Sequence, residues 1–332
     1  MGERELYYAD AMGFLAPPGQ PIIADPELKF LDLVHVTVAP PISADQATLV
    51  KMVQKSVAEI RTQPTRLEIV RDAIIVIHKP KDMTAVVMGL QNSPTDYKYD
   101  DLFDLGVRVV QLAYQDEHEI CGGFGYQLMH ITDRCRRVLD DLARIGMILD
   151  LSHLGHISAM EVLDHIEKEK LHLRVCISHT GSYRFYSHPR NMLDDVMVRV
   201  AALDGVVGVY GLTFGLDWVD NSMVPMARHA NHFVEICGGD KVVIGSDGTY
   251  QSVPEEVYRA RCEDMRKRLD QYGIFNVRYP NNVEGTETPD KLRVILNGLL
   301  AHGHMDEEVC NKIIGTNLRQ FFISALPQKG VL

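Results

Sequence analysis

The stretch MILDLSH at residues 147–153 decides the fold class of this chain, because its run of apolar residues stops on Ser-His. The stretch LRVCISH at residues 173–179 ends in the same way, and KVVIGSD at residues 241–247 ends on a carboxylate. A buried parallel strand typically has such an apolar run, and the residues at its C-terminal end lie where α/β enzymes place their chemistry. The three stretches therefore predict parallel strands whose last side chains share one site.

These last side chains have the chemistry of metal ligands. His153 and His179 offer neutral imidazole nitrogens, and Asp247 offers an oxygen that can bind a metal or take a proton. Each also has a structural alternative, since a polar residue at a strand end can cap the next helix or bond a backbone carbonyl. Two histidines at the ends of successive strands favour the metal site.

Strand-like and helix-like segments alternate along nearly the whole chain. The candidate strands are residues 5–12, 30–38, 85–91, 107–114, 147–153, 173–179, 205–212 and 241–247. Apolar residues repeat at helical spacing in residues 44–61, 131–145, 157–168, 192–203 and 224–238, and further helices are predicted at 257–272, 289–302 and 305–322. Eight such units favour a closed parallel barrel over an open sheet. The predicted fold is α/β, a (β/α)8 TIM-like barrel with extra C-terminal helices and a single domain over residues 1–332.

The composition is that of a soluble globular protein. The 332 residues are 46% hydrophobic and 24% charged, enough for a large core. The net charge of −11 and the pI near 5.7 argue against nucleic acid or an anionic membrane as a partner. No apolar stretch approaches the roughly 20 residues of a membrane helix, and residues 1–10 carry acids where a signal peptide would be apolar. We therefore expect a cytoplasmic protein.

Several short motifs resemble, in order and spacing, those of the membrane (renal) dipeptidase family of the amidohydrolase superfamily. They are GLQN at 89–92, LGVRVVQLAY at 105–114, DLSH at 150–153, SH at 178–179, HPRN at 188–191 and GSD at 245–247. The resemblance covers roughly residues 6–322. It implies a distorted (β/α)8 barrel with two zinc ions that hydrolyses dipeptides, commonly as a homodimer.

The resemblance also assigns roles to individual residues. It implies that His153 and His179 bind one metal, that Arg190 holds the substrate carboxylate, and that Asp247 binds the other metal and acts as general acid/base. These roles suit the residue types, because a planar guanidinium pairs bidentately with a carboxylate. A structural alternative for Arg190 is an ion pair with Asp194 or its neighbour at the start of a helix.

The chain departs from the family pattern at four positions. Met12 and Phe14 stand where the family's first strand ends in His-x-Asp, and Gln91 stands where a carboxylate bridges the two metals. Tyr114 replaces the substrate-polarising histidine of the fourth strand. Neither Met12 nor Phe14 is a zinc ligand in character, and a neutral amide bridges cations poorly. We therefore expect a reduced site with one divalent ion, zinc by the resemblance, or none.

Other residues could supply ligands to such a reduced site. The loop after the fourth strand carries His118 and Glu119, which could contact the metal or the substrate or simply be solvated. His35 lies inside the second strand and is interpreted as a core histidine.

Three functions remain open on the sequence alone. The first is a dipeptidase-like metal-dependent hydrolase that cleaves an amide bond in a dipeptide or similar small carboxylated substrate. In it, Asp247 and Tyr114 are catalytic, and Arg190, Gln91 and Tyr114 contact the substrate. The second is a metal-free enzyme in which Asp247 and Tyr114 transfer protons. The third is a non-catalytic descendant that binds a ligand or joins an assembly.

Overall fold

The computed structural model describes residues 6–16, 21–22, 28, 30–39, 45–63, 66–91, 98–115 and 119–328. Within these residues one parallel sheet runs in the order β10-β1-β2-β4-β5-β6-β7-β8-β9, and β3 pairs with β4 at its side. The strands are β1 (Ala9–Phe14), β2 (Leu33–Thr37), β3 (Leu67–Ile69), β4 (Thr84–Leu90), β5 (Val107–Val110), β6 (Ile148–Asp150), β7 (Arg174–Thr180), β8 (Val207–Tyr210), β9 (Val242–Gly245) and β10 (Gly248–Thr249).

The sheet closes on itself where β9 leads into β10. β10 pairs in parallel with β1, with Gly13 opposite Gly248. The Asp247 N–H donates to the Met12 carbonyl at 2.8 Å, and the Tyr250 N–H donates to the Phe14 carbonyl at 2.8 Å. The carboxyl ends of the strands therefore surround one mouth, as the predicted α/β barrel requires.

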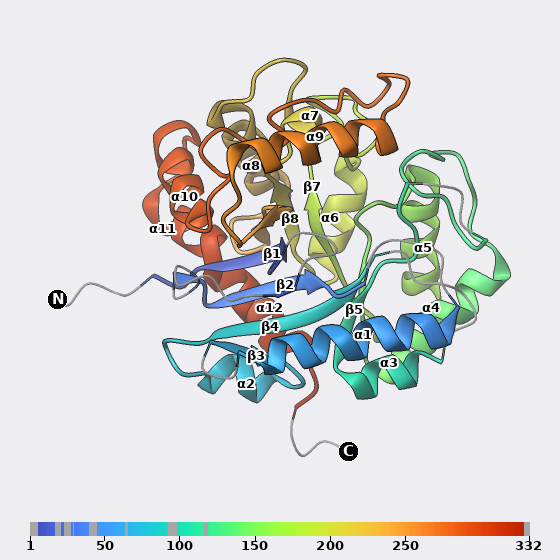
Figure 1. Ribbon diagram of the computed structural model, residues 1–332. Helices are drawn as coiled ribbons and strands as arrows, with labels where there is room; N and C mark the ends of the chain where they lie inside the picture. The colour runs from blue at the N-terminus through green and yellow to red at the C-terminus, as the bar shows by residue number, and fades with distance from the viewer. Residues whose placement is uncertain are drawn as a thin grey trace.

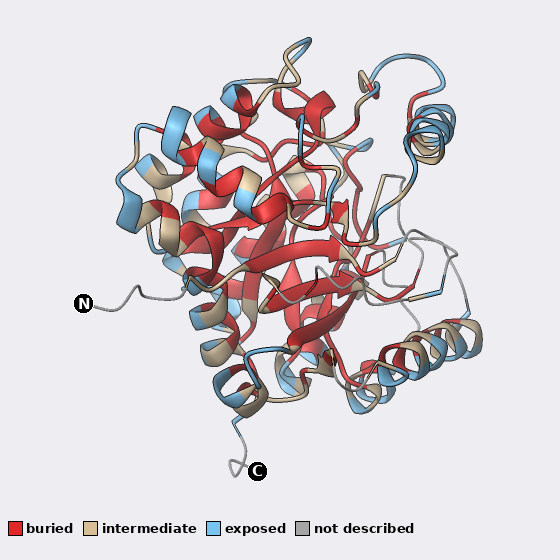
Figure 2. Ribbon diagram, turned by 60° about the vertical axis from the view of Figure 1, so that its left-hand side comes forward, coloured by how far each residue is buried: buried red, intermediate tan, exposed pale blue. Residues whose placement is uncertain are grey.

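Helices surround the sheet on its outside (Figure 1). They are α1 (Gln46–Arg61), α2 (Ala73–His78), α3 (Tyr99–Leu105), α4 (Asp133–Ile145), α5 (His156–Glu169), α6 (Asp194–Ala202), α7 (Thr213–Leu216), α8 (Met223–Cys237), α9 (Glu255–Leu269), α10 (Lys291–His302), α11 (Glu307–Asn311) and α12 (Asn317–Ala325). Figure 2 shows the buried strands inside and the exposed faces of the helices outside. Among the described residues, no helix combines the length and hydropathy needed to cross a membrane.

The local sequence explains where these elements form. All seven residues of β4 are buried, because one face of the strand lies inside the barrel and the other lies against helices. The Thr132 side chain caps α4 by accepting from the Cys135 N–H, and Gly146 ends the helix with a left-handed backbone, φ 84°. The buried face of α4 has helical spacing and consists of Cys135, Val138, Leu139 and Leu142.

Several predicted boundaries were wrong. The strands predicted at 107–114 and 147–153 end at Val110 and Asp150, and the strand predicted at 5–12 is Ala9–Phe14. The polar residues of the site therefore project from loops that follow the strands. β3 and β10 have no counterpart among the predicted strands, because two or three residues are too short to show a period.

The helix predicted at 305–322 is also interrupted, by a π-helical turn at Lys312–Thr316 between α11 and α12. Gly315 lies so close to the Tyr7 carbonyl oxygen that a Cβ would be 1.7 Å from it. The helix thus passes the first strand at a point where no side chain fits.

A buried histidine ties α8 to the loops at the barrel mouth. His229 Nδ1 accepts from the Ser182 N–H at 2.8 Å, so Nε2 carries the hydrogen that is donated to the Leu216 carbonyl at 3.0 Å. Burial lowers the pKa of His229 from 6.5 to about 4.

This lowered pKa makes the stability of the protein sensitive to acid. The unfolded chain takes up the proton near pH 6.5 and the folded chain only near pH 4, so the stabilisation is complete above pH 6.5 and is lost as the pH falls. At pH 5 the loss from this residue is about 2 kcal/mol. We expect the free energy of unfolding, measured with denaturant, to fall between pH 7 and pH 5 in the wild type. In His229→Ala this fall should be about 2 kcal/mol smaller. Equal changes in both proteins would contradict this assignment.

Candidate active site

A small cavity lies at the mouth of the barrel and contains the predicted site residues. Its volume is about 30 Å³, which is room for only one or two water molecules. Loops that follow β8 and the segment from the end of α9 onward supply its apolar wall, which consists of Leu212, Phe214, Met265, Leu269, Phe275 and Val277. The polar groups described next therefore act in surroundings that contain little water.

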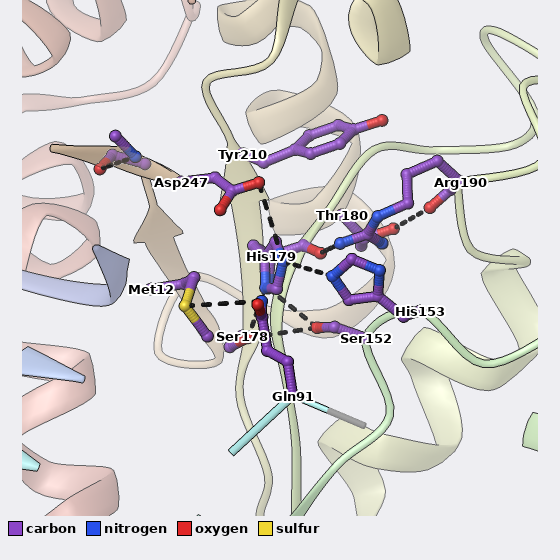
Figure 3. Close-up of polar contacts among 12 residues, drawn as sticks. Met12, Gln91, Ser152, His153, Ser178, His179, Thr180, Arg190, Tyr210 and Asp247 are labelled. Atoms are coloured by element: carbon purple, nitrogen blue, oxygen red, sulfur yellow. Dashed lines mark hydrogen bonds and ion pairs between the residues drawn. The ribbon is translucent and has the colours of Figure 1, made fainter. Parts of the chain in front are cut away.

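Two imidazoles face each other beside this cavity. His153 Nε2 and His179 Nε2 are 3.0 Å apart (Figure 3). Burial, together with the nearby positive charge of Arg190, lowers the pKa of both histidines well below 6.5. Both rings are therefore neutral near pH 7, which is the form that binds metals. The Tyr114 ring stacks on His153 with the ring centroids 4.2 Å apart.

Asp247 completes this group, on the other side of His179 from His153 (Figure 3). Its Oδ2 lies 4.0 Å from His179 Nε2. Burial raises the pKa of Asp247 to about 6, although Arg190 acts to lower it. Both Asp247 and His153 have left-handed backbone conformations, with φ 53° and 72°. Non-glycine residues in this conformation are strained, and such strain is found where a side chain must be held for function.

Arg190 brings an unused donor to the same place. Its side chain is only 4% exposed, and its Nη2 donates to the His179 carbonyl at 3.2 Å. Its Nη1 is buried and has no hydrogen-bond partner among the described residues. A buried guanidinium N–H without an acceptor is costly, so Nη1 is available to donate to a ligand oxygen.

The two histidines fit one metal ion. Two nitrogen ligands of a tetrahedral zinc, each at about 2.0–2.1 Å, lie roughly 3.3 Å apart, and the observed separation of the two Nε2 atoms is 3.0 Å. In the described part of the chain, no group of three or more His, Cys, Asp or Glu side chains has the arrangement of a complete site. The donor set is therefore two imidazoles with one carboxylate nearby.

The residues do not fit a second metal ion. Met12 and Gln91 stand where the family pattern has ligands, and the Gln91 amide Nε2 donates to the Met12 sulfur at 3.9 Å. Phe14 offers no donor atom. The departures seen in the sequence therefore remain departures in three dimensions, because no described carboxylate or imidazole replaces the missing ligands.

The structure brings most of the predicted site residues together. The cavity is lined by His153, Arg190, Asp247 and Tyr114. His179 does not line it but contacts His153. Gln91 is buried below them and does not line the cavity.

The other sequence-based interpretations had different outcomes. Arg190 has no ion pair with Asp194, which instead lies 3.0 Å from His232. His35 is confirmed as a core histidine, since it is buried with Nδ1 2.7 Å from the Ala11 carbonyl. Glu119 pairs with Arg134 on the surface, and His118 lies outside the described residues.

Other parts of the site had little or no signal in the sequence. Phe124 and Phe275 line the cavity from loops, where apolar residues have no periodic pattern. His188 positions both a loop and Arg190, because its Nδ1 accepts from the Arg190 N–H at 3.1 Å and its Nε2 donates to the Phe275 carbonyl at 2.8 Å. Only the HPRN motif pointed to this histidine.

Comparisons with known proteins agree with this architecture. The chain is 27% identical over 164 residues to an uncharacterized dipeptidase of Schizosaccharomyces pombe, covering 46% of this chain and 37% of the relative. It is 27% identical over 241 residues to the dipeptidase tcpJ of Claviceps purpurea, covering 69% of this chain and 48% of the relative. The chain thus spans less than half the length of these curated relatives.

Solved structures show the same fold. An amidohydrolase from Pseudomonas aeruginosa superposes with a TM-score of 0.79 at 22% identity, covering 98% of both chains. A metallo peptidase from Rhodobacter sphaeroides, liganded with a phosphinate mimic of L-Ala-D-Ala, superposes with a TM-score of 0.72 at 16% identity, covering 96% of this chain and 98% of the other. The sequence model of the membrane dipeptidase family, peptidase family M19, matches residues 32–263, which is more than half of the chain. The chain therefore belongs to the membrane dipeptidase family, peptidase family M19.

Proposed function

We propose that this protein is a metal-dependent hydrolase that cleaves an amide bond in a dipeptide or a similar small carboxylated substrate. The observation that carries the proposal is the unpartnered Nη1 of Arg190, which is buried beside the cavity that His153 and Asp247 also line. A carboxylate on this guanidinium would place the rest of a small substrate against the groups able to cleave it. The acidic composition and the family resemblance support a cytoplasmic homodimer as the working form.

His153 and His179 would hold one divalent ion, with Asp247 as a third donor. When bound, such an ion supplies Lewis acidity and a lowered pKa for water. Asp247 takes a proton from the attacking water as the water oxygen bonds to the amide carbon. It then returns the proton to the leaving nitrogen as the C–N bond breaks. A carboxylate at this position can accept a proton and give it back.

Tyr114 would act as a hydrogen-bond donor. Burial raises the pKa of its hydroxyl to about 12, so the group keeps its proton near neutral pH. From its place in the cavity lining, stacked on His153, Tyr114 would donate its hydroxyl to the carbonyl oxygen of the scissile bond. This position would replace the substrate-polarising histidine of the family pattern.

The apolar wall would select the side chain beside the substrate carboxylate. Leu212, Phe214 and Val277 offer it no polar partner. The cavity of about 30 Å³ is too small for a dipeptide, so substrate binding would require part of the apolar wall to move outward. We therefore propose substrates with an apolar residue at the carboxyl end.

Removal of metal tests the reaction class. We expect treatment with a chelator to abolish hydrolysis of dipeptides that end in Leu or Phe. One equivalent of zinc should restore it, because the two histidines would hold a single ion. Dipeptides ending in Asp or Lys serve as controls for the apolar wall and should be poor substrates. Hydrolysis that survives complete chelation would favour the metal-free enzyme instead.

A further inference from the structure

A buried carboxylate joins the ends of two site-bearing strands, β6 and β7. Asp150 is fully buried, and its Oδ1 accepts from the backbone N–H groups of Ser152 at 3.0 Å and Ser178 at 2.9 Å. Its Oδ2 accepts from the Ser178 hydroxyl at 2.5 Å and from the Gln111 amide at 2.5 Å. Three of these four partners can only donate, so an ionised carboxylate satisfies them all.

The same arrangement occurs a second time, where the barrel closes. Asp10 is also fully buried, and its Oδ1 accepts from the N–H groups of Met12 at 3.1 Å and Ser246 at 2.8 Å. Its Oδ2 accepts from the Ser246 hydroxyl at 2.5 Å and from the Tyr250 hydroxyl at 2.7 Å. In both places the serine directly precedes a site residue, either His179 or Asp247.

The two arrangements differ in the fourth partner of the carboxylate and in the other contacts of the serine. The Ser178 hydroxyl also lies 3.2 Å from the Ser152 hydroxyl, and the Ser246 hydroxyl accepts from the Gly248 N–H at 3.2 Å. The Ser178 hydroxyl oxygen lies 2.6 Å from Nδ1 of His179, whereas Ser246 contacts no imidazole. A hydroxyl has a single hydrogen, and Ser178 gives it to the carboxylate of Asp150. Its oxygen can then only accept from the imidazole, so Nδ1 of His179 must carry a hydrogen. The neutral ring consequently has its lone pair on Nε2, the atom that faces His153.

We propose that Asp150 and Ser178 are positioning residues that hold His179 in the tautomer with hydrogen on Nδ1. The inference concerns the protein without metal, and only its consequence for ion binding rests on the proposed function. His153 has no such control, because its Nδ1 is buried and unpartnered within the described structure. Ligand histidines typically donate their second N–H to a carboxylate or another acceptor, and loss of that acceptor costs about 10–100-fold in metal affinity.

Asp150→Asn is the most direct test, because it should reverse the direction of hydrogen-bond donation from residue 150 through Ser178 to His179. The two backbone N–H groups require an acceptor at the Oδ1 position, so the amide NH2 takes the place of Oδ2. It then donates to Ser178 and to the Gln111 amide, which turns to offer its Oε1, an oxygen without a partner in the wild type. The Ser178 hydroxyl can then donate to Nδ1 of His179 at 2.6 Å or to the Ser152 hydroxyl at 3.2 Å, and the shorter contact favours Nδ1, which moves the ring hydrogen to Nε2. Asp10→Asn is the matched control, since it makes the same change in a cage without an imidazole.

Long-range ¹H–¹⁵N spectra of histidine-labelled, metal-free protein report the tautomer directly. We expect His179 to carry hydrogen on Nδ1 in the wild type and in Asp10→Asn, and on Nε2 in Asp150→Asn. If Asp150→Asn does not fold, Ser178→Ala should still lose the single Nδ1–H form, while Ser246→Ala keeps it. Hydrogen on Nε2 in the wild type, or an unchanged tautomer in the folded Asp150→Asn or Ser178→Ala protein, would overturn the inference.

A zinc titration of the same proteins separates this inference from the proposed function. We expect the dissociation constant of Asp150→Asn to be about 10–100-fold higher than that of the wild type, since a protonated Nε2 cannot bind a metal. If the tautomer reverses as expected but the wild type binds no zinc, the positioning role stands and the metal-dependent hydrolase fails.

Discussion

Replacing both His153 and His179 with alanine should remove metal binding. The wild type is expected to bind about one zinc ion per chain, because two imidazoles face each other and no described residues complete a second site. Structural zinc sites with four ligands contribute about 10–16 kcal/mol, so each ligand is worth roughly 3 kcal/mol, and losing two should weaken binding about 10⁴-fold. Elemental analysis of protein purified without a His-tag or chelator, followed by isothermal titration with zinc, measures this loss.

His165→Ala is the control for the loss of an imidazole, because His165 lies on α5 and pairs with Asp140 at 3.0 Å, away from the site. This variant should keep the full metal content. Two ions per chain in the wild type would show that the first-strand region holds ligands after all. No bound metal, even after supplementation, would exclude the metal-dependent hydrolase and leave the metal-free enzyme or the binding protein.

Arg190→Met should lose about 10²–10⁴-fold in kcat/KM toward carboxylated substrates. Truncating one partner of a buried ion pair costs about 3–5 kcal/mol, and Nη1 of Arg190 is expected to gain its partner only when substrate binds. Methionine keeps most of the length and packing of the side chain against the rings of Phe124 and Tyr210, so the fold should be preserved.

Two controls isolate the charge of Arg190 from its other effects. Arg199→Met makes the same change on α6, where Arg199 pairs with Asp164 at 2.8 Å, and should change kcat/KM less than twofold. A substrate with an amidated carboxyl terminus should be a poor substrate for the wild type and should lose little further in Arg190→Met. If the variant discriminates between the free and amidated substrates as strongly as the wild type, Arg190 does not bind the carboxylate.

The strands that carry the site could be predicted from the sequence, because parallel strands buried on both faces have continuous apolar runs. MILDLSH, LRVCISH and KVVIGSD placed His153, His179 and Asp247 at one edge of the sheet, and the structure brings all three to the barrel mouth. The motif order also identified the family, which the match over residues 32–263 confirms. The exact ends of the strands were less accessible, because an apolar run can continue into the loop beyond the last ladder hydrogen bond.

The sequence alone indicated eight of the ten strands, the family and the identity of the donor groups, because these follow from local periodicity and motif spacing. Only the tertiary structure showed that the cavity is closed by side chains from Met265 to Val277, which lie far from the strand motifs along the chain. Only the tertiary structure showed, too, that Asp150 bonds to Ser178 and Asp10 to Ser246. Those contacts join residues 28 and 236 positions apart, and no local pattern encodes which buried donors will meet one carboxylate.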